Sequence, residues 1–538
     1  MITESYWPAD TSRPVLELTA GELLRRAAAA DAGRTALVEV APVGSALTGA
    51  ARTDRRWTYG ELLADAEQAA AWLGSRFSPG EHVAVWAPNV PEWVILQYGA
   101  ALAGVVLVTA NPALRAAELE YVLRQSRSVG VVHVDAFRGT DMAGIVAQIR
   151  GRLPDLRETV SFTGWAEHIR GTAPRQLPRV GPGDPMQIQY TSGTTGFPKG
   201  AVLDHRGMVT NASYVIARAG FPEGGVWATA LPLFHTAGCG LSVLGTASVG
   251  GTLVLAQSFQ PELVLSALEE WRAGLFAGVP AMYSALLAHP RFEDFDLSGC
   301  RILASGGDAV PPALVEAAER RFGARFTTVY GQTELSPILA QTATDDAVAD
   351  RRETTGRPLW QAEVKIVDGS GAVLPVGAEG EILARGYQVM REYFAMPEAT
   401  AAAIDADGWL RTGDLGVMDG RGFLRVTGRL KDMIIRGGEN IYPREIEVAL
   451  TRHPGVAGAA VLGVPDPDWG EQVAAVIVPA GPVPAAADLH AHLRALLAPH
   501  KTPRHWYVAE AIPANAMGKA QKFLLRRRID AGELPVLA

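Results

Sequence analysis

A repeated alternation of short apolar runs with amphipathic segments constrains the fold of this chain more than any other feature of its sequence. Residues 60–73 have apolar side chains at helical spacing, and residues 82–86 form a strand-like run that ends at a Pro-Asn turn signal. The alternation returns later, with helices expected at 261–271, 280–287 and 311–322 and strands at 274–279, 301–304 and 326–330. Strands that alternate with helices form parallel sheets covered by helices, so we expect an α/β fold.

The pattern changes near residue 358, where short strands separated by Gly-containing and Asp-Gly turns predict a small antiparallel sheet. A smaller unit follows residues 428–431, and its order of strand, helix, two strands, helix, strand and basic helix predicts an α+β domain. We therefore expect a large N-terminal domain of helix-covered parallel sheets with a small antiparallel sheet, followed by a small α+β C-terminal domain.

The composition argues against several classes of function. A chain of 538 residues with a net charge of −8 and no basic stripe is not expected to bind nucleic acid. Its two cysteines exclude a disulfide framework and favour a reducing compartment, and its N-terminus shows no secretion signal. Two uncharged stretches, 93–114 and 224–261, are interrupted by Gly and Pro, so we interpret both as protein interior. We expect a cytoplasmic protein without integral membrane contact.

The segment YTSGTTGFPKG at 190–200 is a candidate phosphate-binding loop. It departs from the P-loop pattern, because Pro198 stands where the second Gly belongs and Gly200 replaces the hydroxyl residue. It lies between two apolar strands, 186–190 and 201–203, which predicts a hairpin rather than a strand-to-helix turn. Glycines let backbone N–H groups approach a phosphate closely, while hydroxyl groups and Lys199 converge on it. A flexible polar surface loop is the alternative interpretation.

Five further motifs follow this loop in the chain. They are SGGDAV at 305–310, YGQTELSP at 330–337, GWLRTGDLG at 408–416, GRLKDMIIRGGENIYPREIE at 428–447 and AMGKAQKFLLR at 516–526. Together with the loop, and in the same order, they resemble the motifs of the AMP-forming adenylating superfamily, which includes acyl-CoA synthetases, aryl-CoA ligases, luciferases and peptide-synthetase adenylation domains. The resemblance implies an N-terminal adenylating domain at 1–430 and a mobile C-terminal domain at 431–538 that carries the catalytic lysine.

The resemblance also implies roles for particular residues. The implied catalytic residues are Lys519, His235, Thr333 and Glu334, and the implied magnesium ligands are Glu334 and Thr191. The implied nucleotide-binding residues are Thr191, Ser192, Gly193, Thr194, Thr195, Gly196, Lys199, Gly307, Asp308, Ala309, Tyr330, Gly331, Gln332, Thr333, Asp414 and Arg429. Lys431 is the implied hinge, and Gly437 and Gly438 are implied to line the path of CoA or another acceptor.

Several of these assignments agree with the chemistry of the side chains. A hard carboxylate oxygen such as that of Glu334, beside a triphosphate, is what Mg²⁺ prefers, and the carboxylate of Asp414 is suited to grip the vicinal diol of a ribose. His235 lies on an apolar run, where a histidine is more often a core residue, but its place resembles the family position that abuts the acyl carboxylate. Cys239 is four residues further on, and we interpret it as a buried structural thiol.

The expected function is an ATP-dependent acid–CoA ligase that acts through an acyl-adenylate, with ATP and Mg²⁺ as cofactors, a small carboxylic acid as substrate and CoA as co-substrate. Two alternatives keep the fold and change the acceptor: loading of an acyl carrier protein, or ATP-dependent diazotisation of an aromatic amine with nitrite. A non-enzymatic ATP-binding module is disfavoured, because Glu334 and Lys519 are needed only for chemistry. The sequence leaves open the identity of the acid and whether the chain forms a homodimer.

Overall fold

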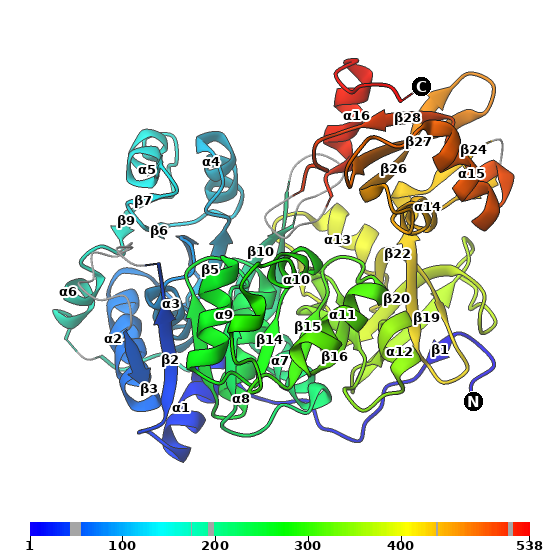
Figure 1. The fold of residues 1–538 in the computed structure, drawn as a ribbon. Coiled ribbons are helices and arrows are strands. Elements are labelled where there is room, and N and C mark those ends of the chain that lie inside the picture. The colour runs from blue at the N-terminus through cyan, green and yellow to red at the C-terminus, as the bar shows by residue number, and fades with distance from the viewer. Residues whose placement is uncertain (43–54, 174, 192–197, 437–438, 515–519, 538) are drawn as a thin grey trace.

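The computed structural model describes residues 1–42, 55–173, 175–191, 198–436, 439–514 and 520–537. Most of the chain forms a broad N-terminal body built on large sheets, and the last hundred residues form a smaller domain that sits on one end of it (Figure 1). Among the described residues, no helix combines the length and the apolar character needed to cross a membrane.

Within the described residues, one sheet has seven strands in the order β21-β11-β10-β5-β4-β6-β9. These strands are β4 (His82–Trp86), β5 (Val106–Ala110), β6 (Gly130–His133), β9 (Glu158–Ser161), β10 (Pro185–Thr191), β11 (Lys199–Asp204) and β21 (Glu392–Tyr393). The strands from β10 to β9 are parallel, whereas β11 is antiparallel to both of its neighbours. The β10–β11 pairing confirms that the Gly- and hydroxyl-rich segment connects two strands of a hairpin.

A second sheet contains nine described strands in the order β18-β17-β16-β15-β14-β12-β13-β2-β3. They are β2 (Thr35–Val40), β3 (Arg56–Thr58), β12 (Val226–Thr229), β13 (Thr252–Ala256), β14 (Leu275–Ala277), β15 (Ile302–Ser305), β16 (Arg325–Gly331), β17 (Ile338–Gln341) and β18 (Arg357–Pro358). The strands from β16 to β2 are parallel, and antiparallel strands close both ends. The parallel part confirms the α/β fold that strand–helix alternation predicts.

Helices cover these sheets. They include α1 (Ala20–Ala30), α2 (Tyr59–Arg76), α3 (Pro91–Ala103), α7 (His205–Ala219), α9 (Pro261–Glu270), α10 (Pro280–Leu287) and α11 (Pro312–Phe322). Helix α3 is buried on every side, which explains why residues 93–114 carry no charge. Helices α1 and α2 each begin with a capping box, formed by a Thr and a Glu three residues later, and α9, α10 and α11 each begin with Pro.

A third, antiparallel sheet has the order β1-β19-β20-β22-β23. Its strands are β1 (Tyr6–Trp7), β19 (Ala362–Val367), β20 (Gly380–Gly386), β22 (Leu410–Met418) and β23 (Leu424–Arg429). This confirms the antiparallel sheet predicted after residue 358. The edge strand β1 comes from the N-terminus, far away in the chain, and the sequence pattern does not indicate that pairing.

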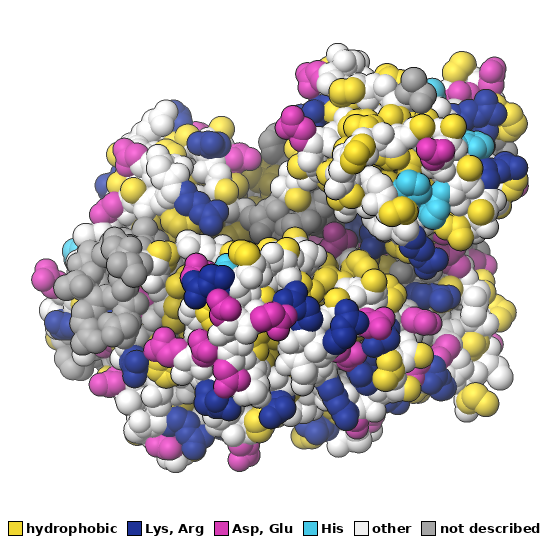
Figure 2. Space-filling model, viewed as in Figure 1, with side chains coloured by type: hydrophobic (Ala, Val, Ile, Leu, Met, Phe, Trp, Pro, Cys, Tyr) yellow, Lys and Arg dark blue, Asp and Glu magenta, His cyan; other side chains and the backbone are white. Residues whose placement is uncertain are grey.

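The C-terminal domain follows the predicted order of elements, except that two strands instead of one precede its first helix. Its strands are β24 (Ile434–Arg436), β25 (Glu439–Ile441), β26 (Val456–Asp466), β27 (Gly470–Pro479) and β28 (His505–Val508), and its helices are α14 (Pro443–Leu450), α15 (Ala486–Leu496) and α16 (Lys522–Asp530). Its core is a separate cluster of side chains from these elements. Figure 2 shows a hollow between this domain and the lobe that carries α4 (Ala116–Gln125) and α5 (Met142–Arg150).

Candidate active site

A cavity of about 740 Å³ lies where the three sheets of the N-terminal domain meet the segment that leads into the C-terminal domain. Its lining comes from strand ends and loops of all three sheets, so residues far apart in the sequence share one space. Many of the residues implied by the sequence motifs line it: Thr191, Lys199, His235, Gly307, Gly331, Gln332, Thr333, Glu334, Asp414, Arg429 and Lys431.

The first polar group in the cavity consists of Lys199, Glu334 and Tyr393. Thr191 and Lys199 pair across the two ends of the hairpin, and the neighbouring strand β21 brings Tyr393 alongside. The Nζ atom of Lys199 lies 4.9 Å from the centre of the Tyr393 ring, and the Tyr393 hydroxyl donates to Oε1 of Glu334 at 2.8 Å. Burial, reinforced by the Glu334 carboxylate, raises the pKa of Tyr393, so its hydroxyl stays protonated and remains a donor.

The Glu334 carboxylate is therefore held in place from one side. Only 7% of its surface is exposed, and its backbone carbonyl accepts a hydrogen bond from the amide of Met390 at 2.8 Å. The role of Tyr393 does not follow from the sequence motifs, because no local pattern connects Tyr393 with Glu334, which lies 59 positions earlier in the chain.

The second polar group surrounds Asp414 on β22. The Tyr330 hydroxyl donates to Oδ2 of Asp414 at 2.9 Å, and Nε of Arg429 lies 3.4 Å from Oδ1. Asp414 and Arg429 are paired across the β22–β23 ladder, which explains why these two motifs meet. The arrangement presents a carboxylate and a guanidinium to the same cavity.

Two glycines of the motifs are required by the backbone itself. Gly307 has φ of +79°, a left-handed conformation that a residue with a side chain rarely adopts. At Gly331 an added Cβ would lie 2.0 Å from the carbonyl oxygen of Pro337, so no larger residue fits there. Gly331 therefore lets its strand lie close against the backbone at Pro337, and both glycines line the cavity.

His235 follows β12 in the chain and lines the cavity. Loss of hydration lowers the pKa of His235 to about 4, so the imidazole is neutral near pH 7. Its ring lies 4.6 Å from that of Phe234 and lines the cavity. Cys239 is buried, its Sγ contacts Gln187 and Gln189, and burial raises the pKa of its thiol to about 12. Cys239 is therefore an unreactive core thiol, as the sequence predicts.

Further charged residues line the cavity near the C-terminal domain. Glu381 and Arg411 form an ion pair of 2.7 Å that the sequence analysis does not indicate. Loss of hydration, reinforced by Arg429, lowers the pKa of Lys431. Lys431 lies in a short 3₁₀ helix, Leu430–Asp432, that connects β23 to the first strand of the C-terminal domain.

Some of the implied site residues do not line this cavity. Of those that the structure describes, Asp308, Ala309 and Tyr330 are absent from its lining, and Tyr330 instead contributes through its hydrogen bond to Asp414. The others, Ser192, Gly193, Thr194, Thr195, Gly196, Gly437, Gly438 and Lys519, lie outside the described residues.

Part of the lining, which we call the apolar branch, is apolar and comes largely from α7 and from strands of the nine-stranded sheet. The apolar side chains along it include Val215, Ile216, Trp227, Leu231, Leu241, Leu275, Ala277 and Ile338. Such a branch is suited to hold the hydrocarbon part of an organic substrate whose polar end reaches His235.

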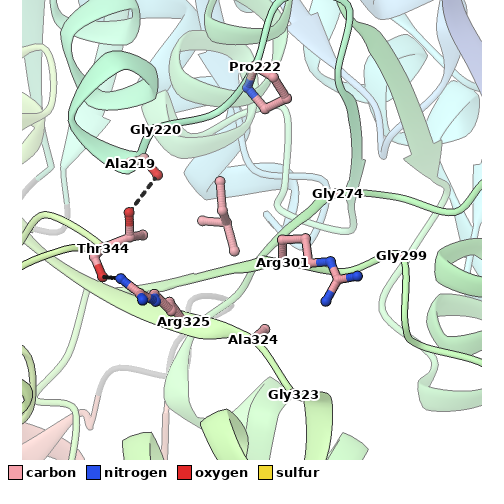
Figure 3. A pocket seen from close by; sticks show the side chains of 11 residues that line it. Ala219, Gly220, Pro222, Gly274, Gly299, Arg301, Gly323, Ala324, Arg325 and Thr344 are labelled. Atoms are coloured by element: carbon pink, nitrogen blue, oxygen red, sulfur yellow. Dashed lines mark hydrogen bonds between the residues drawn. The ribbon is translucent and has the colours of Figure 1, made fainter.

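A second cavity, of about 530 Å³, lies at the opposite edge of the same sheet, where β14, β15 and β16 begin (Figure 3). Arg325 donates to the carbonyl of Thr344 at 3.1 Å, and the Thr344 hydroxyl donates to the carbonyl of Ala219 at 3.2 Å. Ala219 lines both cavities. None of the residues implied by the motifs lines this second cavity.

Comparison with known proteins identifies the family of the chain. Residues 24–394 match the family model of AMP-binding enzymes, and residues 445–519 match the model of the AMP-binding enzyme C-terminal domain. The first match alone spans more than half of the chain.

Individual relatives agree with this assignment over nearly their full length. The feruloyl-CoA synthase of Amycolatopsis sp is 39% identical over 474 residues, covering 88% of this chain and 94% of that protein. The mitochondrial medium-chain acyl-CoA ligase ACSF2 of Mus musculus is 32% identical over 563 residues, covering 98% of this chain and 90% of that protein. The solved structure of a Mycobacterium tuberculosis fatty acyl CoA synthetase is similar, with a TM-score of 0.76 and 31% identity, covering 96% of this chain and 99% of that one. The chain therefore belongs to the AMP-binding enzyme family, and it is an AMP-forming acid–CoA ligase.

Proposed function

We propose that this ligase works in two half-reactions in the cavity described above, with Lys199, Glu334, Asp414 and Arg429 holding MgATP and the apolar branch holding the acid. A carboxylate is a poor electrophile, because its oxygen is a poor leaving group. Attack of the carboxylate on the α-phosphate of ATP releases pyrophosphate and forms an acyl-AMP, from which the thiol of CoA then displaces AMP. The observation that carries this proposal is that cationic, carboxylate and apolar side chains line one and the same cavity.

At the triphosphate end, Lys199 would neutralise phosphate charge, and Glu334 would hold a magnesium ion. Among the described residues no cluster of three or more His, Cys, Asp or Glu side chains could hold a metal by itself. A single buried carboxylate suits a magnesium ion that takes its remaining ligands from phosphate oxygens and water. Magnesium bound there would neutralise the charge of the triphosphate, and Tyr393 would fix the orientation of the Glu334 carboxylate.

At the nucleoside end, Asp414 would accept hydrogen bonds from the two ribose hydroxyl groups. Its carboxylate is oriented by the Tyr330 hydroxyl and lies beside Arg429, so it does not need to reorganise when the ribose arrives. His235 would meet the carboxylate of the acid. Because the pKa of His235 is lowered to about 4, the imidazole can donate a hydrogen bond without transferring its proton, and the carboxylate remains nucleophilic.

Two lysines would separate the half-reactions. We place the domain boundary at residues 430 and 431 and assign to Lys519 the stabilisation of charge during adenylation, as the family resemblance implies. Lys431 lies in the short connection between the domains, so it would act as the hinge about which the C-terminal domain turns before thiol attack. That turn would carry Lys519 away and bring Gly437 and Gly438 to the path of CoA.

The experiment compares Lys519→Ala and Lys431→Pro in the two half-reactions separately. Lys519→Ala should lose about 10²–10³-fold in acid-dependent pyrophosphate exchange, yet still convert a prepared acyl-AMP to thioester when CoA is added. Lys431→Pro, which restricts the connection, should show the opposite pattern. Lys501→Ala is the control, because Lys501 belongs to the same domain and pairs with Glu445 at 2.5 Å instead of lining the cavity. Equal losses in both half-reactions, with folding intact, would exclude the two-position mechanism.

A further inference from the structure

A buried group of polar side chains connects β10 with the segment that follows His235. This polar ladder consists of Thr109, Gln187, Gln189 and Cys239, and none of the four is more than 3% exposed. Thr109 is paired with Gln189 across β5 and β10, and its hydroxyl donates to Oε1 of Gln189 at 3.0 Å. Polar groups in the interior are costly unless they bond to one another, and when they do, they fix their relative positions.

Gln189 is the junction of the polar ladder. Its Nε2 donates to Oε1 of Gln187 at 2.7 Å and to Sγ of Cys239 at 3.2 Å. The thiol of Cys239 in turn donates to Oε1 of Gln187 at 3.2 Å. Together with the bond from Thr109, both hydrogens and the oxygen of the Gln189 amide have partners. The amide is therefore held in one orientation, and it ties β5, β10 and Cys239 together.

Cys239 extends this constraint to His235. The backbone amide of Cys239 donates to the His235 carbonyl at 3.0 Å, and Nε2 of Gln97 on α3 donates to the Cys239 carbonyl at 2.9 Å. Between His235 and Cys239, the chain at Gly238 packs so closely that an added Cβ would lie 2.2 Å from the carbonyl oxygen of Pro232. The turn from His235 to Cys239 is thus tight, so a shift of Cys239 would also displace His235.

The other end of the polar ladder is the hairpin proposed to hold the triphosphate. Thr191 follows Gln189 by two residues on β10, so the two side chains lie on the same face of the strand. Thr191 is paired with Lys199 on β11, and both residues line the cavity, as does His235. The amide of Gln189 therefore links the strand that leads to the proposed phosphate site with the segment that carries the group proposed to meet the acid.

Adenylation requires accurate spacing of these two parts, because the carboxylate oxygen must reach the α-phosphate, and a misplacement of about 1 Å can cost about 10²-fold in rate. We propose that Gln189 is a positioning residue for adenylation, which sets the separation of the hairpin and the His235 segment through its bonds to Gln187 and Cys239. This inference rests on the proposed function, since it assumes that the hairpin holds the triphosphate and that His235 meets the acid. Cys239 then acts through its hydrogen bonds and not as a nucleophile.

The experiment measures kcat and KM separately in Gln189→Met and Cys239→Ala. Neither residue lines the cavity, so the KM values for ATP and for the acid should stay close to those of the wild type. The kcat of acid-dependent pyrophosphate exchange should fall about 10- to 100-fold. Conversion of a prepared acyl-AMP to thioester should be unchanged, because the acyl and phosphate groups are already joined in that substrate. A general loss of folded enzyme would instead lower both half-reactions equally.

Three further variants locate the effect in the polar ladder. Cys300→Ala is the matched control and should keep the wild-type kcat, because Cys300 is also a buried thiol but its Sγ contacts the Ile302 carbonyl at 3.7 Å, away from the polar ladder. Cys239→Ser keeps a donor and an acceptor, so it should restore most of the kcat lost in Cys239→Ala. The double variant of Gln189→Met and Cys239→Ala should be no slower than the slower single variant, because both changes break the same link.

The outcomes separate this inference from the proposed function. If no acid supports pyrophosphate exchange by the wild type, or if Lys199→Ala and His235→Ala both behave as the wild type, the proposed function fails and the inference fails with it. If those variants are impaired but Gln189→Met and Cys239→Ala keep the wild-type kcat, only the inference is overturned. Equal losses in both half-reactions, an equal loss in Cys300→Ala, no recovery in Cys239→Ser or multiplied losses in the double variant would also overturn it. Cys239→Ala, the smaller change, decides the matter if Gln189→Met does not fold.

Discussion

Removal of the Tyr393 hydroxyl is the most direct test of the proposed role of Glu334 as a magnesium ligand. Tyr393→Phe deletes the donor that lies 2.8 Å from Oε1 of Glu334 but keeps the ring beneath the ammonium group of Lys199. The change therefore isolates one hydrogen bond. Both side chains are more than nine-tenths buried, so water cannot easily replace the lost donor.

The expected size of the effect follows from the charge of the acceptor. A hydrogen bond to a charged group contributes about 1.5–3 kcal/mol, and each 1.4 kcal/mol is about a factor of ten in an equilibrium constant. If the bond acts by orienting Glu334 for the metal, the magnesium concentration needed for half-maximal activity should rise about 10- to 150-fold. The KM for the acid should stay close to the wild-type value, because the proposed acid site is formed by other residues of the cavity.

The assay is acid-dependent pyrophosphate exchange measured over a magnesium series at fixed free ATP. Tyr190→Phe is the matched control: Tyr190 also lines the cavity, but its hydroxyl donates to Gln125 and to the Val122 carbonyl, away from Glu334. An unchanged magnesium requirement in Tyr393→Phe, or an equal shift in Tyr190→Phe, would refute the reasoning.

Three further predictions concern other parts of the structure. Lys199→Ala should raise the KM for ATP about tenfold or more while leaving the order of preference among acids unchanged, as measured by pyrophosphate exchange over an ATP series; an unaltered ATP requirement would contradict the role of Lys199. Burial lowers the pKa of His205 and of His235 from 6.5 to about 4, so the unfolded chain binds more protons between these values, and the stability they contribute is complete above pH 6.5 and is lost as the pH falls from 6.5 through 4. Each histidine should contribute up to about 3 kcal/mol to the free energy of unfolding. The Nδ1 atom of His205 accepts a hydrogen bond from the Ala20 amide. His205→Gln should therefore make the measured free energy of unfolding depend less steeply on pH. Cys239 and Cys300 are buried, and burial raises the pKa of both thiols to about 12, so an aromatic disulfide reagent at pH 8 should titrate no thiol in the native protein and two after denaturation.

Local patterns were sufficient to predict the elements that surround the site. Periodicity predicts the strand His82–Trp86 and the helix Pro280–Leu287 with the bounds found in the structure, and the strands on either side of the Gly- and hydroxyl-rich segment pair as the predicted hairpin. These predictions succeed because the alternation of apolar residues, Pro at helix starts and Gly at turns act within a few residues of each other. The edge strand Tyr6–Trp7 escapes this reasoning, since its partner Ala362–Val367 is more than 350 residues away.

The motifs by themselves determine which residues could hold a nucleotide, since their residue types and order are written in the chain. The tertiary structure decides how those residues are held and what else joins them. Tyr330 meets Asp414 across 84 residues, and Tyr393 meets Glu334 across 59. No periodic pattern encodes such contacts, because they depend on how separate sheets pack, and packing is decided by the shape of the whole core.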